Sequence, residues 1–348
     1  MQTSVIKCLV IGDPHYRTSH VIQSEEFNIK IVETAKQVAP DFIVVLGDVL
    51  HEHERIHVSP LTRATDFLHS LSEISKTYLL IGNHDRPNNS NFLTTEHPFN
   101  AMKHWSNIIV VDCGFVDSIK EQQFIFMPYV PAGRFQEALQ IVYERTNQEV
   151  TFDHFLSQTT ALFAHQEFCG AKMGAIISTK GDPWAVELPL VISGHIHDYD
   201  QLQDNIFYVG TPFQHAFGDR SDKSVSVFTF LADKSYQHER IDLAMRKLEI
   251  VYLDADQVDH YFPPLDKIIK LVIRGTTEQL NVLAKNSKIK EWKEQGFKIA
   301  FKPYKGDNKP KERLVNSQQI NFNSYFLSRI EADNNADVSA VYHKIFDV

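Results

Sequence analysis

Residues 5–15 read VIKCLVIGDPH, an apolar run that ends abruptly in Gly12-Asp13-Pro14-His15. A short apolar run bounded by turn residues is typical of a buried strand, because both faces of such a strand lie in a core. The aspartate and the histidine then follow the carboxyl end of the strand. Ligands of open α/β folds bind at this edge of the sheet, so the stretch predicts both a fold class and a site.

The same pattern recurs along the chain and predicts a layered α/β domain. Helical stretches at about 25–38 and 59–74 separate the first three apolar runs. Two later runs, at 206–209 and 225–230, read as further strands without a polar cluster. The runs with polar ends are 42–46 before Gly47-Asp48, 78–81 before Gly82-Asn83-His84-Asp85, 161–164 before His165, and 188–193 before Gly194-His195-Ile196-His197.

The length of the chain and the local pattern of its sequence predict how it is divided into domains. A chain of 348 residues exceeds the usual size of one core, so we expect a large domain and a smaller one. A strand at 268–273, a helix at 277–285 and a strand at 297–301 predict a small α+β domain, and an exposed loop is expected at 302–313. The expected divisions are 1–243, 244–315 and a C-terminal tail at 316–348.

The composition is typical of a soluble cytoplasmic protein. The chain opens without a signal-peptide pattern and no apolar run approaches roughly 20 residues, so we expect neither secretion nor a membrane span. Three widely spaced cysteines, Cys8, Cys113 and Cys169, argue against a disulfide framework. A net charge of −9 weighs against binding nucleic acid through bulk positive charge, although carboxylates that hold metal ions would account for part of it.

The polar ends of the strands make up a set of metal ligands. Carboxylate, amide and imidazole groups without cysteine suit divalent ions such as manganese, iron or zinc. Two ions about 3.5–4 Å apart need one bridging carboxylate and open positions for water and phosphate. One such residue is commonly a turn residue, but repeated polar groups beside a core are costly unless they share a partner. The candidates are Asp13, His15, Asp48, Asn83, His84, His165, His195 and His197.

In residue type and in order, these motifs resemble those of the calcineurin-like metallophosphoesterases. The resemblance implies a four-layered α/β/β/α sandwich and two divalent ions, with manganese expected and magnesium, iron or zinc as alternatives. It implies that Asp48 bridges the ions and that His84, beside the ligand Asn83, is the general acid. The implied ligands are Asp13, His15, Asp48 and His197 for one ion, and Asp48, Asn83, His165 and His195 for the other.

Three further features resemble the SbcD-type subunits of DNA repair nucleases. His51 lies three residues after Asp48, where that family has a histidine that assists the general acid, although a turn residue is the alternative reading. Residues 208–213 (YVGTPF) precede Phe217-Gly218-Asp219, and a further domain follows where that family has a DNA-contacting cap. The resemblance implies a DNA exonuclease or endonuclease of repair or recombination, which works with an SbcC-like, SMC-type coiled-coil ATPase.

Lysines and aromatic residues alternate near the end of the second domain, as they would on a DNA-binding surface or on an ordinary solvated loop. An apolar segment around 322–330, or residues 341–346, would dock the ATPase or pack on its own domain. A phosphatase or cyclic-nucleotide phosphodiesterase of the same fold is the alternative function, and self-association is left open. A non-catalytic scaffold predicts missing ligands, and none is missing. The candidate DNA contacts are Lys298, Lys302, Lys305, Lys309, Lys311 and Arg313.

Overall fold

The computed structural model describes residues 5–146, 149–264 and 266–304. The chain divides into two compact units, Met1–Ile250 with Pro263–Lys270 and Val251–Phe262 with Leu271–Val348. The expected C-terminal tail at 316–348 lies outside the described residues. Within the described ranges, no helix combines the length and the apolar character needed to cross a bilayer.

The described part of the first unit contains two six-stranded sheets. The first sheet has the order β14-β13-β1-β2-β3-β4, with β1 to β4 parallel and β13 antiparallel to both of its neighbours. The strands predicted at 5–11, 42–46, 78–81 and 225–230 are confirmed in this sheet. Its strands are β1 (Ile6–Ile11), β2 (Phe42–Val45), β3 (Lys76–Leu80), β4 (Ile108–Val111), β13 (Val225–Phe230) and β14 (Tyr236–Ile241).

The second sheet has the order β11-β12-β10-β7-β6-β5. Its central strands are parallel, and its edge strands β5 and β11 are antiparallel to their neighbours. The strands predicted at 161–164, 188–193 and 206–209 are confirmed here, and a hairpin of β8 (Lys172–Met173) and β9 (Ile176–Ile177) lies between two of them in sequence. The strands are β5 (Phe115–Ile119), β6 (Gln122–Phe126), β7 (Thr159–Ala164), β10 (Leu190–Ser193), β11 (Asp200–Gln203) and β12 (Ile206–Tyr208).

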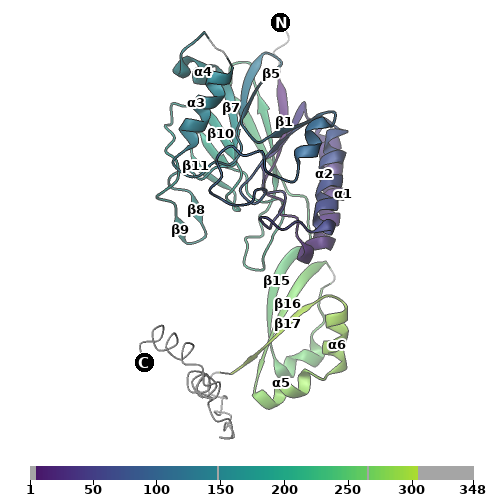
Figure 1. Ribbon diagram of the computed structural model, residues 1–348. Helices are drawn as coiled ribbons and strands as arrows, with labels where there is room; N and C mark the ends of the chain where they lie inside the picture. Colours follow the sequence, from purple (N-terminus) through teal and green to yellow (C-terminus); the bar gives the residue numbers. More distant parts are fainter. Residues whose placement is uncertain (1–4, 147–148, 265, 305–348) are drawn as a thin grey trace, which may run out of the picture. The chain divides into compact units, whose positions relative to one another are not determined.

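Helices cover the outer face of each sheet and complete the predicted α/β/β/α sandwich. Figure 1 shows α1 (Val21–Val38) and α2 (Val58–Ser72) on one side of the strands, and α3 (Phe135–Arg145) and α4 (Phe152–Gln158) on the other. Three apolar cores separate the four layers. Alternation along β1 serves two of them, because Leu9 packs in the core under α1 and α2 whereas Val10 packs in the core between the sheets. Short 3-10 helices η1 (Thr18–His20) and η2 (Asn100–His104) lie in the connections.

A small α+β arrangement includes the described part of the second unit and is built around a three-stranded sheet with the order β15-β16-β17, whose first two strands begin within the residues of the first unit. The strands predicted at 268–273 and 297–301 and the helix predicted at 277–285 are confirmed. Thr276 and Gln279 form a capping box that fixes the start of the first helix. The loop predicted from Lys302 was placed too early, because Lys302 and Pro303 still belong to the last strand. The elements are β15 (Lys247–Asp254), η3 (Ala255–His260), β16 (Lys267–Gly275), α5 (Thr277–Leu283), α6 (Ser287–Glu294) and β17 (Lys298–Pro303).

Candidate metal centre

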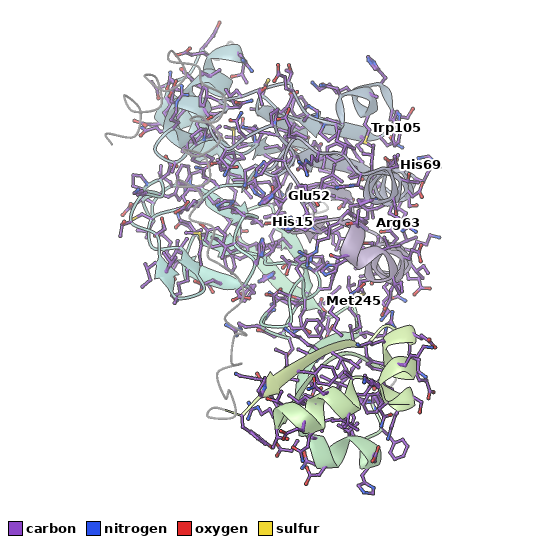
Figure 2. The ribbon with its side chains drawn as sticks, turned by 60° about the horizontal axis from the view of Figure 1, so that its bottom comes forward. His15, Glu52, Arg63, His69, Trp105 and Met245 are labelled. Atoms are coloured by element: carbon purple, nitrogen blue, oxygen red, sulfur yellow. The ribbon has the colours of Figure 1, made fainter. Side chains whose placement is uncertain are left out.

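Two groups of potential metal ligands meet where strands of the two sheets end. Within each group the ligand atoms lie within 4.8 Å of one another. The parallel strands β1, β2 and β3 deliver ligands from one sheet, and β7 and β10 deliver them from the other. Figure 2 labels His15 at this centre. The first group is Asp13, His15 and His197, and the second is Asp48, His165 and His195.

Asp48 lies between the two groups. Its Oδ2 atom is 3.7 Å from Nε2 of His15 in the first group and 3.3 Å from Nε2 of His165 in the second. Its Oδ1 atom accepts a hydrogen bond of 2.8 Å from the backbone N–H of His84. One carboxylate oxygen is therefore held by the backbone while the other faces both groups, which is the position that a bridging ligand needs.

Asn83 belongs to the second group by geometry. Its Oδ1 atom lies 3.1 Å from Nε2 of His165 and 3.0 Å from Nδ1 of His195. His165 donates from Nδ1 to the carbonyl oxygen of Leu46 at 2.8 Å, which leaves its Nε2 toward the centre. A carbonyl on the outer nitrogen is the usual way in which proteins orient a metal-binding histidine.

The backbone is strained at three of these residues. His15, Asp48 and His195 have positive φ values of 46°, 48° and 77°, although residues other than glycine rarely adopt this region. Such strain costs about 1–3 kcal/mol per residue and collects at functional sites. Close packing adds to the constraint, because a Cβ atom on Gly82 would lie 2.2 Å from Oδ1 of Asp48.

The charges of the centre are arranged for a cation. Burial, together with the nearby charge of Asp48, raises the pKa of Asp13 to about 7. Burial also works against the charged form of Asp48, but His165 and other histidines hold the pKa of Asp48 well below its usual range. Although burial alone lowers the pKa of His165, Asp48 and Asp13 raise it to about 9. A positive charge on His165 therefore balances the buried carboxylates when no ion is present, and a bound cation would displace that proton.

The remaining histidines of the two groups are neutral. Burial lowers the pKa of His195 to about 3, and it lowers the pKa of His15 and His197 as well. A neutral imidazole offers a lone pair to a metal ion.

One buried oxygen provides a direct test of whether a metal ion fits. Oδ1 of Asp13 is shielded from solvent and accepts no hydrogen bond from the described part of the chain. A buried carboxylate oxygen without a donor is costly, whereas a coordinated cation would satisfy it. The donor set of carboxylate, amide and imidazole groups suits a divalent ion of the first transition row. The residues present therefore fit the two divalent ions that the sequence predicts.

His84 and His51 lie together at the edge of the first group. Nδ1 of His84 donates to the backbone carbonyl of His51 at 2.6 Å, and the two rings are nearly parallel with centroids 5.6 Å apart. His51 also approaches His15, with 3.4 Å between their Nδ1 atoms, so His15, His51 and His84 form a third cluster of potential ligands. Burial and the charge of Arg17 lower the pKa of His51 to about 4, which makes its ring neutral.

Sequence reasoning missed three residues that support the centre. His53 stacks on His84, with ring centroids 4.6 Å apart and 19° between the planes. His215 donates from Nε2 to the backbone carbonyl of Asp13 at 3.0 Å. Arg17 contacts His51 at 3.4 Å and donates to the carbonyl of His215. His53 lies in the histidine-rich turn that also holds His51, whereas nothing in the sequence around Arg17 or His215 distinguishes them.

The structure also places Asp85 and two of the candidate DNA contacts. Asp85 accepts from the backbone N–H groups of Leu50 at 2.9 Å and Gly82 at 3.0 Å, so it ties the loops that follow β2 and β3 together. Lys298 and Lys302 are exposed on β17. The other candidate DNA contacts, Lys305, Lys309, Lys311 and Arg313, lie outside the described residues.

Comparison with known proteins finds one protein family and several similar proteins. The sequence profile of calcineurin-like phosphoesterases matches residues 6–199. "Putative phosphoesterase 078R" of Invertebrate iridescent virus 3 is 36% identical over 97% of this chain and 95% of the relative. "Putative phosphoesterase 244L" of Invertebrate iridescent virus 6 is 37% identical over 80% of this chain and 98% of the relative. The solved structure of YfcE, a phosphoesterase from E. coli, is 13% identical, with a TM-score of 0.33, and the match covers 68% of this chain and 100% of that structure.

Proposed function

The chain belongs to the calcineurin-like phosphoesterase family, whose members use divalent metal ions, and from this we propose that it is a two-metal DNA nuclease. The proposal rests mainly on one observation: His84 and His51 lie in contact with each other beside the two groups of potential metal ligands. A phosphodiester has a poor leaving group, so its hydrolysis gains from an acid that protonates the departing sugar oxygen.

The chain's own residues have separate roles in this proposal. Asp13, His15 and His197 would hold one ion, Asn83, His165 and His195 the other, and Asp48 both. When bound, such ions neutralise charge on the phosphoryl oxygens and activate water. The carbonyl of His51 fixes Nδ1 of His84 as a donor, so Nε2 is the nitrogen that exchanges a proton with the departing oxygen. His51 and His53 flank this ring and hold its plane.

We further propose DNA as the substrate in repair or recombination, and an SbcC-like, SMC-type ATPase as the partner. Lys298 and Lys302 are the described candidates for contacts with DNA. The segments proposed to dock the ATPase, around 322–330 and 341–346, lie outside the described residues. Manganese is the proposed metal, because the mixed oxygen and nitrogen donors suit it.

A small-molecule or cyclic-nucleotide phosphodiesterase is the second candidate, and one observation favours it. The cavity beside His84 is lined by Glu52, Glu54 and Glu96, which repel a chain of phosphates. A substrate with a single phosphodiester would avoid that repulsion.

The test compares linear, hairpin and circular DNA with bis-p-nitrophenyl phosphate, in manganese, magnesium or chelator. The proposal predicts manganese-dependent cleavage of DNA that His84→Ala reduces by at least about 10²-fold, the usual contribution of general acid catalysis. Hydrolysis confined to the small ester would contradict the nuclease proposal and favour the second candidate.

A further inference from the structure

A cavity of about 360 Å³ opens beside His84 in the first unit. It is formed by the loop that follows β2 and by two stretches of the loop that follows β3. Its volume falls at the small end of the range for small-molecule sites, so it suits one compact group rather than a stretch of polymer. Figure 2 labels Glu52, one of the residues that line it.

The walls of the cavity combine apolar surfaces with acidic groups. Leu50, Ile56, Pro87 and Pro98 supply the apolar surfaces, and Glu52, Glu54 and Glu96 supply exposed carboxylates. Apolar surface is suited to contact with a flat ring, and carboxylates accept hydrogen bonds from amino groups such as the exocyclic amine of cytosine.

A single arginine, Arg86, also contributes to the lining. It is only 2% exposed, and its Nε and Nη2 atoms have no hydrogen-bond partner among the described residues. Its Nη1 atom donates to the carbonyl of Asn91 at 3.0 Å. The Nε and Nη2 atoms are shielded from solvent, so the arginine contributes positive charge behind the lining rather than an exposed donor. The exposed carboxylates therefore supply the acceptors that a polar ring would meet.

The place of the cavity relative to His84 identifies which part of a substrate enters it. If His84 protonates the departing oxygen, the group attached to that oxygen lies on the same side as the His84 ring. We propose that the cavity binds the departing nucleoside of the substrate, a single terminal nucleoside that carries no other phosphate. This inference rests on the proposed function and assigns a substrate class to the same site.

The reaction remains an ordinary hydrolysis. The oxygen of water bonds to phosphorus, the bond between phosphorus and the nucleoside oxygen breaks, and that oxygen takes a proton from His84. The attacking water releases one proton to solvent, and His84 takes up one proton from solvent before the next turnover, so the net reaction adds one water across the bond. Because the three carboxylates disfavour a second phosphate on the departing nucleoside, we expect cleavage at chain ends that carry no terminal phosphate and slow cleavage of circular DNA. Each cleavage releases one nucleoside and leaves the phosphate on the remaining chain.

Binding to the metal-free protein tests the inference without any turnover. Calorimetric titration in chelator would compare cytidine with its 3′- and 5′-monophosphates. Cytidine should bind more tightly than either monophosphate. Glu54→Gln and Glu96→Gln should each strengthen monophosphate binding about threefold relative to cytidine, the factor for two unit charges about 7 Å apart in water. Glu187→Gln, an exposed change outside the cavity, is the matched control.

The outcomes separate the inference from the proposed function. Monophosphates that bind as tightly as cytidine, no cytidine binding, or cavity variants that behave like Glu187→Gln would overturn the assignment of the cavity. Cytidine binding by a protein that cleaves neither DNA nor a dinucleoside monophosphate would support the cavity and contradict the proposed function.

Discussion

Gly82→Ala is expected to destabilise the fold and to disturb the metal centre at the same time. An added Cβ atom would lie 2.2 Å from Oδ1 of Asp48 and 2.3 Å from the backbone nitrogen of Asp48, against 3.4–4 Å for ordinary contact. Rotation of a side chain cannot relieve the contact with the backbone, so the loops after β2 and β3 must move apart.

The magnitude follows from these distances. Inserting a methyl group into a packed site costs about 1–3 kcal/mol, and the backbone clash places Gly82→Ala near the upper end, about 3 kcal/mol. For a unit of this size the melting temperature would fall by about 6–12 °C. The same movement would displace the carboxylate of Asp48, which is proposed to bridge the ions. Metal binding should then be about 10–100-fold weaker, the usual effect of changing a residue that positions a metal ligand.

Scanning calorimetry in chelator would measure the stability, and equilibrium dialysis against manganese would measure the bound metal. Gly218→Ala is the matched control, because a Cβ atom there meets nothing within 4 Å, and it should change stability by less than about 0.5 kcal/mol. If Gly82→Ala matched Gly218→Ala in both measurements, the tight contact between the loops after β2 and β3 would not be what holds Asp48 in place.

Three further predictions concern the centre and its surroundings. Asp48→Ala should lose both ions in metal analysis, because Oδ2 of Asp48 faces both ligand groups, and retention of two ions would mean that another residue bridges them. Burial disfavours the charge of Asp112, but hydrogen bonds from His97 and Lys103 lower its pKa to about 2. The charged form of Asp112 stabilises the fold by about 2 kcal/mol above about pH 4, and this contribution is lost as the pH falls through 2. In urea unfolding, the free energy of unfolding of Asp112→Asn should therefore fall less over that pH interval than that of wild type. An equal fall in both proteins would contradict the ion pairing. His53→Ala should lower turnover about tenfold with metal content unchanged, whereas His53→Phe, which keeps the stacked ring, should not; equal activity in both would show that the stacking has no positioning role.

The sequence predicted the layered fold and the residues that gather at the centre for a simple physical reason. Parallel strands place their carboxyl ends at one edge of a sheet, so polar residues directly after apolar runs come together in space. Asp13, Asp48 and Asn83 follow strands of the first sheet, and His165 and His195 follow strands of the second. Their assignment as ligands remains a prediction that metal analysis must test.

The residues that were not predicted from the sequence contact the centre through interactions that have no sequence pattern. His215 lies in the connection that follows β12 and contacts Asp13 through its backbone carbonyl, an interaction that leaves no pattern in the sequence. Arg17 likewise donates to the backbone carbonyl of His215 and contacts the ring nitrogen Nε2 of His51. Asp85 directly follows Asn83 and His84 in the sequence, but its contacts with backbone N–H groups of two loops are visible only in three dimensions.

The strands β4, β5 and β6 were not predicted, and a polar strand end alone did not reveal β4, which is directly followed by Asp112. The cavity was not predicted either, because the loops that form it, around residues 50–56 and 84–100, are folded by tertiary contacts rather than by local pattern.

The most direct test of the central claim is the rate of DNA hydrolysis by wild type and His84→Ala, each loaded with manganese and each repeated in chelator. We predict rapid hydrolysis by the loaded wild type, none in chelator, and a loss of at least about 10²-fold in the variant with its metal content intact. Hydrolysis that persists in chelator, or a variant that is as active as wild type, would contradict this prediction.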